Sequence, residues 1–367
     1  MYLRRLNLIN FKTYGELEIE FSPKVNCFVG NNGVGKTNLF DSIHYLAFSK
    51  SYFNSSDSET VKHSANFFLI DGEFVFEDRI ENIQCAFKED QKKRVRRNSK
   101  DYTRLADHIG LIPMVMVSPA DSSLILEGSE ERRRYMNSVI SQYNRQYLED
   151  MIQYNKALHQ RNRILKEFAR DHFFDEDLLT FWDEKMAETG SRIHLLRKEF
   201  LSELMPVFQR YYHTISGGHE SVELIYQSQL DKASMTDLMA ENRERDCQLQ
   251  FTTAGIHRDD LLLQLSGYPM KQQGSQGQQK TYLIALKMAQ YDFLKQVSEV
   301  RPMILFDDVF DKLDSERVTQ IMNLVAADHF GQIFITDTNQ EHLEKILASI
   351  PVDYRLFRIQ NEQVLIV

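Results

Sequence analysis

Residues 30–37 read Gly-Asn-Asn-Gly-Val-Gly-Lys-Thr, which is the spacing of a phosphate-binding loop. Such a loop needs a strand before it and a helix after it, because its backbone N–H groups converge at a helix N-terminus, where the helix dipole favours anions. The flanking residues fit: Val25–Val29 is a short apolar run typical of a buried strand, and residues 38–46 repeat apolar side chains at helical spacing. A glycine-rich turn with an incidental Lys-Thr pair is the weaker alternative. The chain is therefore expected to be an α/β protein with a nucleotide site.

The side chains of this loop suit Mg·ATP. Lys36 would place a positive charge on the phosphates, and the Thr37 hydroxyl would complete the shell of Mg²⁺. The backbone N–H groups would contact β- and γ-phosphate oxygens. The nucleotide-binding residues expected in this loop are Gly30, Asn31, Asn32, Gly33, Val34, Gly35, Lys36, Thr37 and Asn38.

Two carboxylates follow an apolar run much later in the chain. Met303–Phe306 is predicted to be a buried strand, and Asp307 and Asp308 come directly after it. We expect Asp307 to bind Mg²⁺ and Asp308 to orient or deprotonate the attacking water, with Lys36 as the third catalytic residue. Aspartate at position 308 is one methylene shorter than the glutamate common there in related ATPases, which predicts slow hydrolysis. The alternative is that the two acids merely cap a strand.

A second anion pocket is predicted at Gly274–Gln278, just before the expected helix Thr281–Lys295. Backbone N–H groups at the helix N-terminus, with Ser275, Gly277 and Gln278, would bind a γ-phosphate. One chain has no use for two such pockets unless a second copy supplies one of them. The pattern therefore predicts ATP bound between two copies of the chain, and the alternative is an ordinary polar loop before a helix.

Hydrophobic periodicity divides the chain into three segments. Residues 1–118 are predicted to be mostly strands, residues 119–218 to contain two or three long helices from Ser129 to about Ile215, and residues 219–367 to return to strands. We interpret the first and last segments as two parts of an ATPase head and the middle one as an inserted α-helical arm. The expected strands are Leu3–Asn10, Glu16–Phe21, Val25–Val29, Phe67–Phe76, Asn82–Lys88, Lys92–Asn98, Val222–Tyr226, Leu261–Leu265, Met303–Phe306, Gln332–Thr336, Tyr354–Ile359 and Gln363–Val367.

Composition narrows the class of protein. A chain of 367 residues with 42% hydrophobic and 26% charged residues is typical of soluble globular proteins. Cys27, Cys85 and Cys247 are too few and too far apart for a disulfide framework or a zinc site, which favours the cytoplasm. No apolar stretch is long enough to cross a bilayer, so no membrane partner is expected. A net charge of −9 excludes a uniformly basic nucleic-acid coat but leaves room for a local basic strip.

Short motifs along almost the whole chain resemble those of the RecF family, bacterial recombination-repair ATPases related to the heads of SMC and Rad50 proteins. The matching segments are Leu8-x-Asn10-Phe11-Lys12-x-Tyr14, Asn31–Asn38, Ser118-Pro119-x-Asp121, Gly128 with Arg132-Arg133, Gln160-Arg161-Asn162, Gly255-x-His257-Arg258-Asp259-Asp260, Ser275–Thr281 and Asp307-Asp308-Val309-Phe310-x-x-Leu313-Asp314. The resemblance implies an ABC-type head that dimerises on ATP and clamps double-stranded DNA near single-stranded gaps. It also implies RecO and RecR as partners in placing RecA filaments.

The chain departs from this pattern at three places. Ile256 stands where the RecF family usually has proline, Thr336-Asp337-Thr338 replaces the histidine that many ABC ATPases place after the next strand, and no Q-loop glutamine is evident near Ser118-Pro119. These departures favour a slow clamp over a transporter-like hydrolysis cycle. The competing classes are a transporter nucleotide-binding subunit, which would need a coupling surface for membrane helices, and an SMC or Rad50 relative, which would need a far longer arm.

Several polar segments have two open interpretations. Residues 92–100 form the densest basic run and would either contact DNA or protect a strand edge from aggregation. The arginines 132–134 are more simply ion-paired within the chain. Residues 257–260 would contact nucleotide or a second copy, or else form a structural turn with Arg258 paired to an acid. His44 and Trp182 are most simply core residues.

Overall fold

The computed structural model describes residues 1–171, 175–218, 220–309, 317–318, 320–321, 330–340, 343–344, 353–360 and 362–367. The chain divides into two compact units, a head unit and an arm unit. The head unit comprises residues 1–122, 211–218 and 276–367, and the arm unit comprises residues 123–210 and 219–275. The motif residues Phe310, Leu313 and Asp314 lie outside the described part of the chain.

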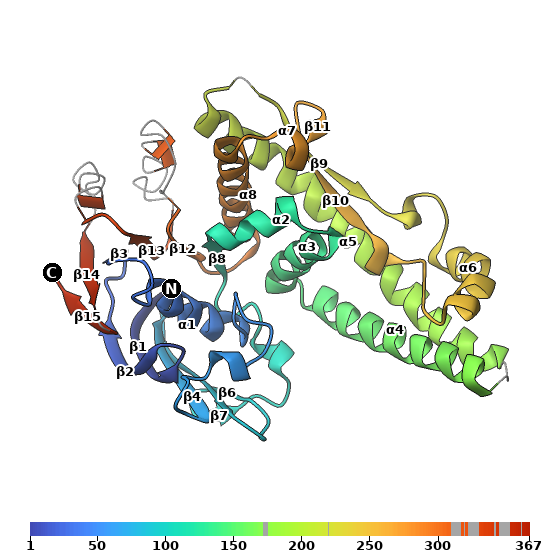
Figure 1. Ribbon diagram of the computed structural model, residues 1–367, viewed down its shortest axis with the longest axis horizontal. Helices are drawn as coiled ribbons and strands as arrows, with labels where there is room; N and C mark the ends of the chain where they lie inside the picture. The colour runs from blue at the N-terminus through green and yellow to red at the C-terminus, as the bar shows by residue number, and fades with distance from the viewer. Residues whose placement is uncertain are drawn as a thin grey trace. The chain divides into compact units, whose positions relative to one another are not determined.

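The head unit contains two sheets (Figure 1). One is antiparallel, with the strand order β2-β1-β4-β5-β6-β7, and the other has the order β15-β14-β3-β13-β12-β8. The strands of the first sheet are β1 (Tyr2–Phe11), β2 (Tyr14–Glu20), β4 (Phe67–Val75), β5 (Ile80–Lys88), β6 (Arg94–Arg97) and β7 (Lys100–Asp101). Those of the second are β3 (Val25–Val29), β8 (Met114–Val117), β12 (Met303–Phe306), β13 (Ile333–Asp337), β14 (Tyr354–Gln360) and β15 (Gln363–Ile366).

The second sheet positions the nucleotide motifs. Its strands β14, β3, β13, β12 and β8 are parallel, whereas β15 pairs antiparallel with β14. Every residue of β3 and β12 is buried, as expected for strands covered on both faces. Helix α1 (Lys36–Phe48) contacts both sheets, and its side chains join one hydrophobic core with them. Helix α8 (Gln276–Val297) is buried along most of its length.

The arm unit is mainly helical. Its helices are α2 (Ser123–Leu126), α3 (Ser129–Tyr143), α4 (Arg145–Asp171), α5 (Glu176–Ser216), α6 (Met235–Leu249) and α7 (Met270–Gln273), and residues 211–216 of α5 group with the head. A small antiparallel sheet joins them, with β9 (Val222–Gln227), β10 (Asp260–Leu265) and β11 (Tyr268–Pro269) in the order β11-β10-β9. Three long helices, α3 to α5, thus occupy the segment where two or three were expected.

The structure differs from the sequence expectations in several places. Residues 219–275 pack with the arm helices, although the sequence segments grouped them with the head. Helix α6 was not predicted, and β6 is shorter than the strand expected over residues 92–98. Ile152 and Leu178 are exposed although both belong to apolar stripes, whereas Arg161 is fully buried. Apolar spacing located the arm helices but not every residue that faces their core.

Candidate nucleotide site in the head

The phosphate-binding loop lies between β3 and α1, as the sequence requires. Gly33 and Gly35 adopt positive φ angles of 82° and 107°, which non-glycine residues rarely tolerate. A Cβ atom on Gly35 would lie 2.9 Å from the hydroxyl of Tyr14, which itself donates a hydrogen bond to the Gly35 carbonyl at 3.1 Å. Only glycine fits at position 35 without moving Tyr14, so the first hairpin of the chain shapes the loop.

Lys36 is buried and holds the loop in its curved form. Its Nζ donates to the carbonyls of Gly30 at 2.8 Å and Asn31 at 3.2 Å. The same Nζ lies 3.9 Å from a carboxylate oxygen of Asp308. Asn31, Asn32 and Gly33 are exposed at the tip of the loop. The ammonium group therefore lies between the loop and the carboxylates, where it can contact phosphate oxygens.

The two aspartates lie directly after β12, beside the start of α1. The Thr37 hydroxyl donates to Oδ1 of Asp307 at 3.2 Å, although the two residues are 270 positions apart in the chain. Thr336 at the end of β13 donates its hydroxyl to the same oxygen at 3.0 Å and accepts from the backbone N–H of Asp308 at 2.8 Å. Asp308 has a φ of 47°, a left-handed conformation that costs energy outside glycine and is typical of functional sites.

The electrostatics and donor set of this site fit a divalent cation. Burial raises the pKa of Asp307 to about 6, and the nearby Asp308 charge adds to this rise. Hydrogen bonds from Thr37 and Thr336 act in the opposite direction. Thr37 Oγ1 and Asp307 Oδ1 are 3.2 Å apart, close to the roughly 2.9 Å expected for neighbouring oxygen ligands of octahedral Mg²⁺. Few protein ligands are needed, because Mg²⁺ is usually held by one or two carboxylates, phosphates and water.

The second predicted anion pocket lies elsewhere. Ser275 is exposed and immediately precedes α8, and Gly277 lies in the first turn of that helix. A Cβ atom on Gly277 would lie 3.2 Å from a guanidinium nitrogen of Arg317, which donates to Thr281 at 3.0 Å. In Figure 1 the first turn of α8 and the first turn of α1 are well separated. A single chain therefore brings Lys36, Thr37, Asp307 and Asp308 together but not the α8 residues.

A buried polar cluster that the sequence did not reveal joins the surroundings of α1 to α8. Lys287 of α8 forms an ion pair with Asp121 at 2.7 Å and lies 3.1 Å from the hydroxyl of Tyr52, which also donates to Asp121. The backbone N–H of Tyr52 donates to Asp41 of α1 at 2.6 Å. Asp121 lies just after Ser118-Pro119, near which the sequence has no evident Q-loop glutamine. The only sequence signal for this cluster is that Asp121 belongs to the Ser118-Pro119-x-Asp121 motif.

The arginines at the start of α3 are engaged inside the arm unit. Arg132 pairs with Asp260 at 2.7 Å, Arg133 donates to the Asp259 carbonyl at 2.7 Å, and Arg134 pairs with Glu131 at 3.0 Å. The interpretation of this run as internally ion-paired is confirmed for residues 132 and 134. Arg133 instead contacts a backbone carbonyl.

Residues 257–260 form a structural turn in the arm. His257 lies between the Tyr154 hydroxyl at 2.8 Å and the Thr252 carbonyl at 3.1 Å, and burial lowers the pKa of His257 to about 4. Asp259 pairs with the buried Arg197 at 2.7 Å. Arg258 donates to the Thr252 carbonyl and lies over the Phe251 ring. The expected acidic partner of Arg258 is thus replaced by a carbonyl and an aromatic face.

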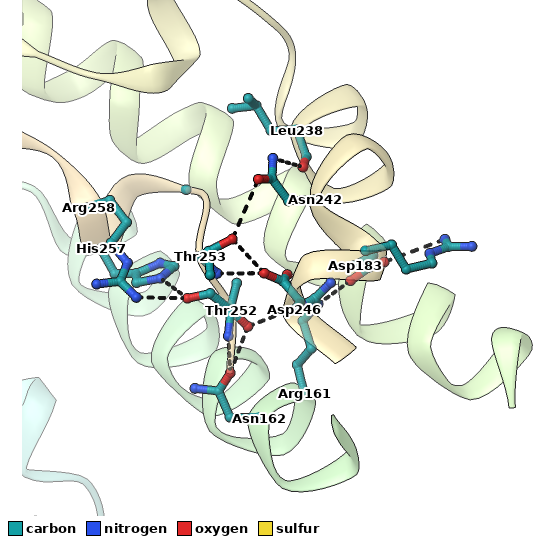
Figure 2. Close-up of polar contacts among 12 residues, drawn as sticks. Arg161, Asn162, Asp183, Leu238, Asn242, Asp246, Thr252, Thr253, His257 and Arg258 are labelled. Atoms are coloured by element: carbon teal, nitrogen blue, oxygen red, sulfur yellow. Dashed lines mark hydrogen bonds and ion pairs between the residues drawn. The ribbon is translucent and has the colours of Figure 1, made fainter. Parts of the chain in front are cut away.

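Figure 2 shows the polar network that holds this turn. Arg161 donates to Asp183 at 2.5 Å, to Asp246 at 2.6 Å and to the Thr252 hydroxyl at 3.0 Å. Asn162 accepts from both the backbone N–H and the hydroxyl of Thr252 at 2.7 Å. The motif residues Arg161 and Asn162 therefore fix the loop that carries Thr252, and nothing in these contacts indicates a nucleotide site.

His44 is a core residue, as expected. It is buried, stacks on Phe48 with ring centroids 4.4 Å apart, and hydrogen-bonds to the Lys50 carbonyl at 3.1 Å. Burial lowers the pKa of His44 to about 4. Trp182 packs against a small hydrophobic cluster of the arm.

Comparisons with known proteins agree with this architecture. The family model described as RecF/RecN/SMC N terminal domain matches residues 2–361. A DNA replication and repair protein RecF from Phocaeicola vulgatus is 49% identical over 366 residues, which cover 99% of this chain and 98% of that protein. One from Bacteroides thetaiotaomicron is 50% identical over 363 residues, which cover 98% and 97%.

Solved structures give the same picture. The recombination mediator protein RecF with ATP, in the RecFOR pathway, has a TM-score of 0.89 at 29% identity and covers 100% of this chain and 97% of its own. An Smc head domain with an extended coiled coil from Pyrococcus furiosus has a TM-score of 0.59 at 17% identity, covering 100% and 96%, which shows a shared fold. The expected ABC-type α/β head with a helical arm is confirmed.

Proposed function

The chain belongs to the RecF family, and we propose that it acts in DNA replication and repair as an ATP-dependent clamp, in which ATP holds two copies together around duplex DNA. The observation that carries the proposal is the convergence of Lys36, Thr37, Asp307 and Asp308 in one copy, from segments far apart in sequence. Curated relatives that match nearly the whole chain are DNA replication and repair proteins by name.

Each residue of the site has a proposed part in handling Mg·ATP. The loop N–H groups and Lys36 bind the phosphates, and Thr37 and Asp307 hold Mg²⁺, which would neutralise phosphate charge. Asp308 orients or deprotonates the attacking water. Its short side chain and its position near Lys36 support slow hydrolysis, so the bound state lasts long enough to act as a switch.

The second copy supplies the missing half of the site. Ser275, Gly277 and Gln278 lie at the N-terminus of α8, where the first turn of a helix presents backbone N–H groups to an anion. Ser275 is exposed, as a residue that contacts a second copy must be. With two such contacts in a symmetric pair, two ATP molecules would join two copies, and hydrolysis would release them.

The clamp acts on double-stranded DNA next to single-stranded gaps, with RecR and RecO, to promote loading of RecA. Support for these finer steps is the family resemblance, together with the RecFOR pathway named for a similar solved structure. The proposed location is the cytoplasm, at the nucleoid. Among the described helices, none combines the length and apolar character that a membrane span requires.

The arm favours a clamp over a chromosome-bridging machine. The longest helix, α5, has 41 residues and is about 60 Å long at 1.5 Å per residue. SMC and Rad50 proteins need arms of hundreds of heptad residues to connect distant DNA segments, so an arm of this length suits contact with one DNA site.

The test is sedimentation of the wild type and of Lys36→Ala, each with and without ATP and gapped duplex DNA. We expect ATP to convert the wild type to a dimer that binds DNA, and Lys36→Ala to stay monomeric. A second variant, Ser275→Arg, should bind ATP but not dimerise.

Mixing the two variants separates the shared-site arrangement from a site within one chain. A mixed dimer contains one intact site, made by Lys36 of one copy and Ser275 of the other, so ATP should restore dimers in the mixture. If the wild type does not dimerise with ATP, or if the mixture behaves as the sum of its parts, the shared site is wrong.

A further inference from the structure

The outer edge of the antiparallel head sheet carries an excess of positive charge. Residues 88–104, which run from the end of β5 through β6 and β7, contain eight lysines and arginines and three acids, although the whole chain has a net charge of −9. In the described part of the sheet β7 is the edge strand, paired only with β6. The excess therefore lies at a sheet edge.

Some of these cations are neutralised inside the head. The pairs are Lys93 with Asp57 at 2.8 Å, Arg96 with Asp101 at 2.8 Å and Arg97 with Glu81 at 2.5 Å. Hydrogen bonds from Arg97 lower the pKa of the buried Glu81 to about 2, so this acid stays charged and keeps its arginine engaged. Lys93 and Arg97 are held by acids that are mostly buried, so they are less available to a ligand, whereas the Arg96–Asp101 pair is exposed and weak.

Four other cations have no such partner. Lys88, Lys92, Arg94 and Lys100 are exposed, and none of them forms an ion pair with an acid in the described part of the chain. We call these four residues the edge strip. Their charges are compensated only by solvent ions, which a polyanion would release on binding.

The strand register directs part of the strip away from the core. Val95 is buried, and Arg94 on the opposite face of β6 lies across from Ala86 of β5. Side chains two residues apart on a strand recur about every 6.7 Å, so neighbouring cations can reach separate phosphates. Arg94 and Arg96 lie across from the small Ala86 and the polar Gln84, and the exposed aromatic residue beside the strip is Phe67, across from Lys88.

The charge at the far side of the same sheet has the opposite sign. Strand β2 is the other edge, and its exposed residues are Glu16, Glu18 and Glu20. A polyanion approaching this sheet would be repelled from β2 and attracted to β6 and β7. The sheet therefore has a preferred side for nucleic acid.

We propose that the edge strip binds the phosphate backbone of duplex DNA, without reading its sequence. The proposal rests on the proposed function, because it names the surface that holds the DNA. Protection of the edge against aggregation explains the charge less well, since β7 has only two residues and is already a poor template for strand addition.

The test compares two variants that remove the same charge. The strip variant is Lys92→Gln, Arg94→Gln and Lys100→Gln together. The control is Lys156→Gln, Lys166→Gln and Lys232→Gln, three exposed arm lysines that also lack an acidic partner in the described residues. Binding of a fluorescent duplex is measured with ATP over a range of KCl concentrations, with thermal melting and ATP binding as checks of the fold.

The salt dependence gives a quantitative expectation. Each phosphate contact contributes about 0.9 to the slope of log affinity against log salt, so the strip variant should lose up to about 2.7 from the slope and up to about 500-fold in affinity at 0.1 M salt. The control should keep the wild-type slope. An unchanged slope in the strip variant, or an equal loss in the control, overturns the proposal. An unchanged slope in the strip variant would favour an acidic protein surface as the partner of the strip. A wild type that binds no DNA at all would instead refute the proposed function.

Discussion

Arg161 provides the sharpest test of how the arm is held together. Its side chain is fully buried and forms ion pairs with two carboxylates, Asp183 and Asp246, from different helices. Replacement with methionine keeps a side chain of similar length but removes the cation. Asp183 then retains only Arg243, at 3.7 Å, and Asp246 retains the hydrogen bonds from Thr253.

The expected cost follows from leaving buried charge uncompensated. Breaking a buried ion pair by removing one partner typically costs about 3–5 kcal/mol, which is two to four orders of magnitude in a local folding equilibrium. Burial already raises the pKa of Asp183, against the lowering effect of Arg161. Without Arg161 the folded-state pKa of Asp183 should rise further above its unfolded value. The variant's penalty should therefore be larger at pH 8 than at pH 5, because protonation relieves it as pH falls.

Hydrogen exchange is the suitable assay, because a chain with two compact units need not unfold in one step. Amides of α6 and of residues 250–258 should exchange about 100-fold faster or more in Arg161→Met than in the wild type. Arg163→Met is the matched control, since Arg163 lies on the same helix in an exposed pair with Glu167 worth only about 0.5 kcal/mol. Equal protection in the two variants, or a larger penalty at acid pH, would refute this account of the network.

Three further outcomes test the head. Gly35→Ala should weaken ATP binding at least about 10-fold by calorimetry, because a left-handed alanine is strained by about 1–3 kcal/mol and its Cβ would meet the Tyr14 hydroxyl; wild-type affinity would contradict this. Lys287→Met should destabilise the head by about 3–5 kcal/mol in urea, because Asp121 stays buried without its cation, and Lys287→Arg should lose less. Because burial lowers the pKa of His44 to about 4, the wild type should lose up to about 3 kcal/mol of stability as pH falls from 6.5 towards 4, and His44→Gln should flatten this slope in acid titrations followed by circular dichroism.

Short apolar runs with sharp polar ends were the most predictable parts of the fold. The bounds of β3 and β12 agree with the sequence expectation at both ends, because each run is followed at once by a glycine or an aspartate. Helix α6 escaped prediction because its buried positions include Asp246 and its buried apolar residues are confined to the first turns. A helix that buries a carboxylate against an arginine leaves little amphipathic signal.

The site shows the same division. The loop glycines with Lys36, and the two aspartates after their apolar strand, are recognisable in sequence because each of these two motifs is a short continuous segment. The contacts of Tyr14 and Thr336 with the site are not, although both residues stand in segments noted in the sequence, since each meets the site only through the pairing of its strand with neighbours. The partnership of Asp121 with Lys287 likewise depends on the approach of α8 to the end of β8, which no local pattern encodes.

The sheet order also has a consequence for biosynthesis. Strand β3 is flanked by β14 and β13, both made of residues after position 332. A ribosome-bound chain that has completed the first 300 residues thus presents β3 with two bare edges and no partner for either. Such a nascent chain has the phosphate-binding loop but not the complete nucleotide site, because Asp307 and Thr336 are still to be synthesised. A chaperone that shields β3 until translation ends would protect the protein from aggregation.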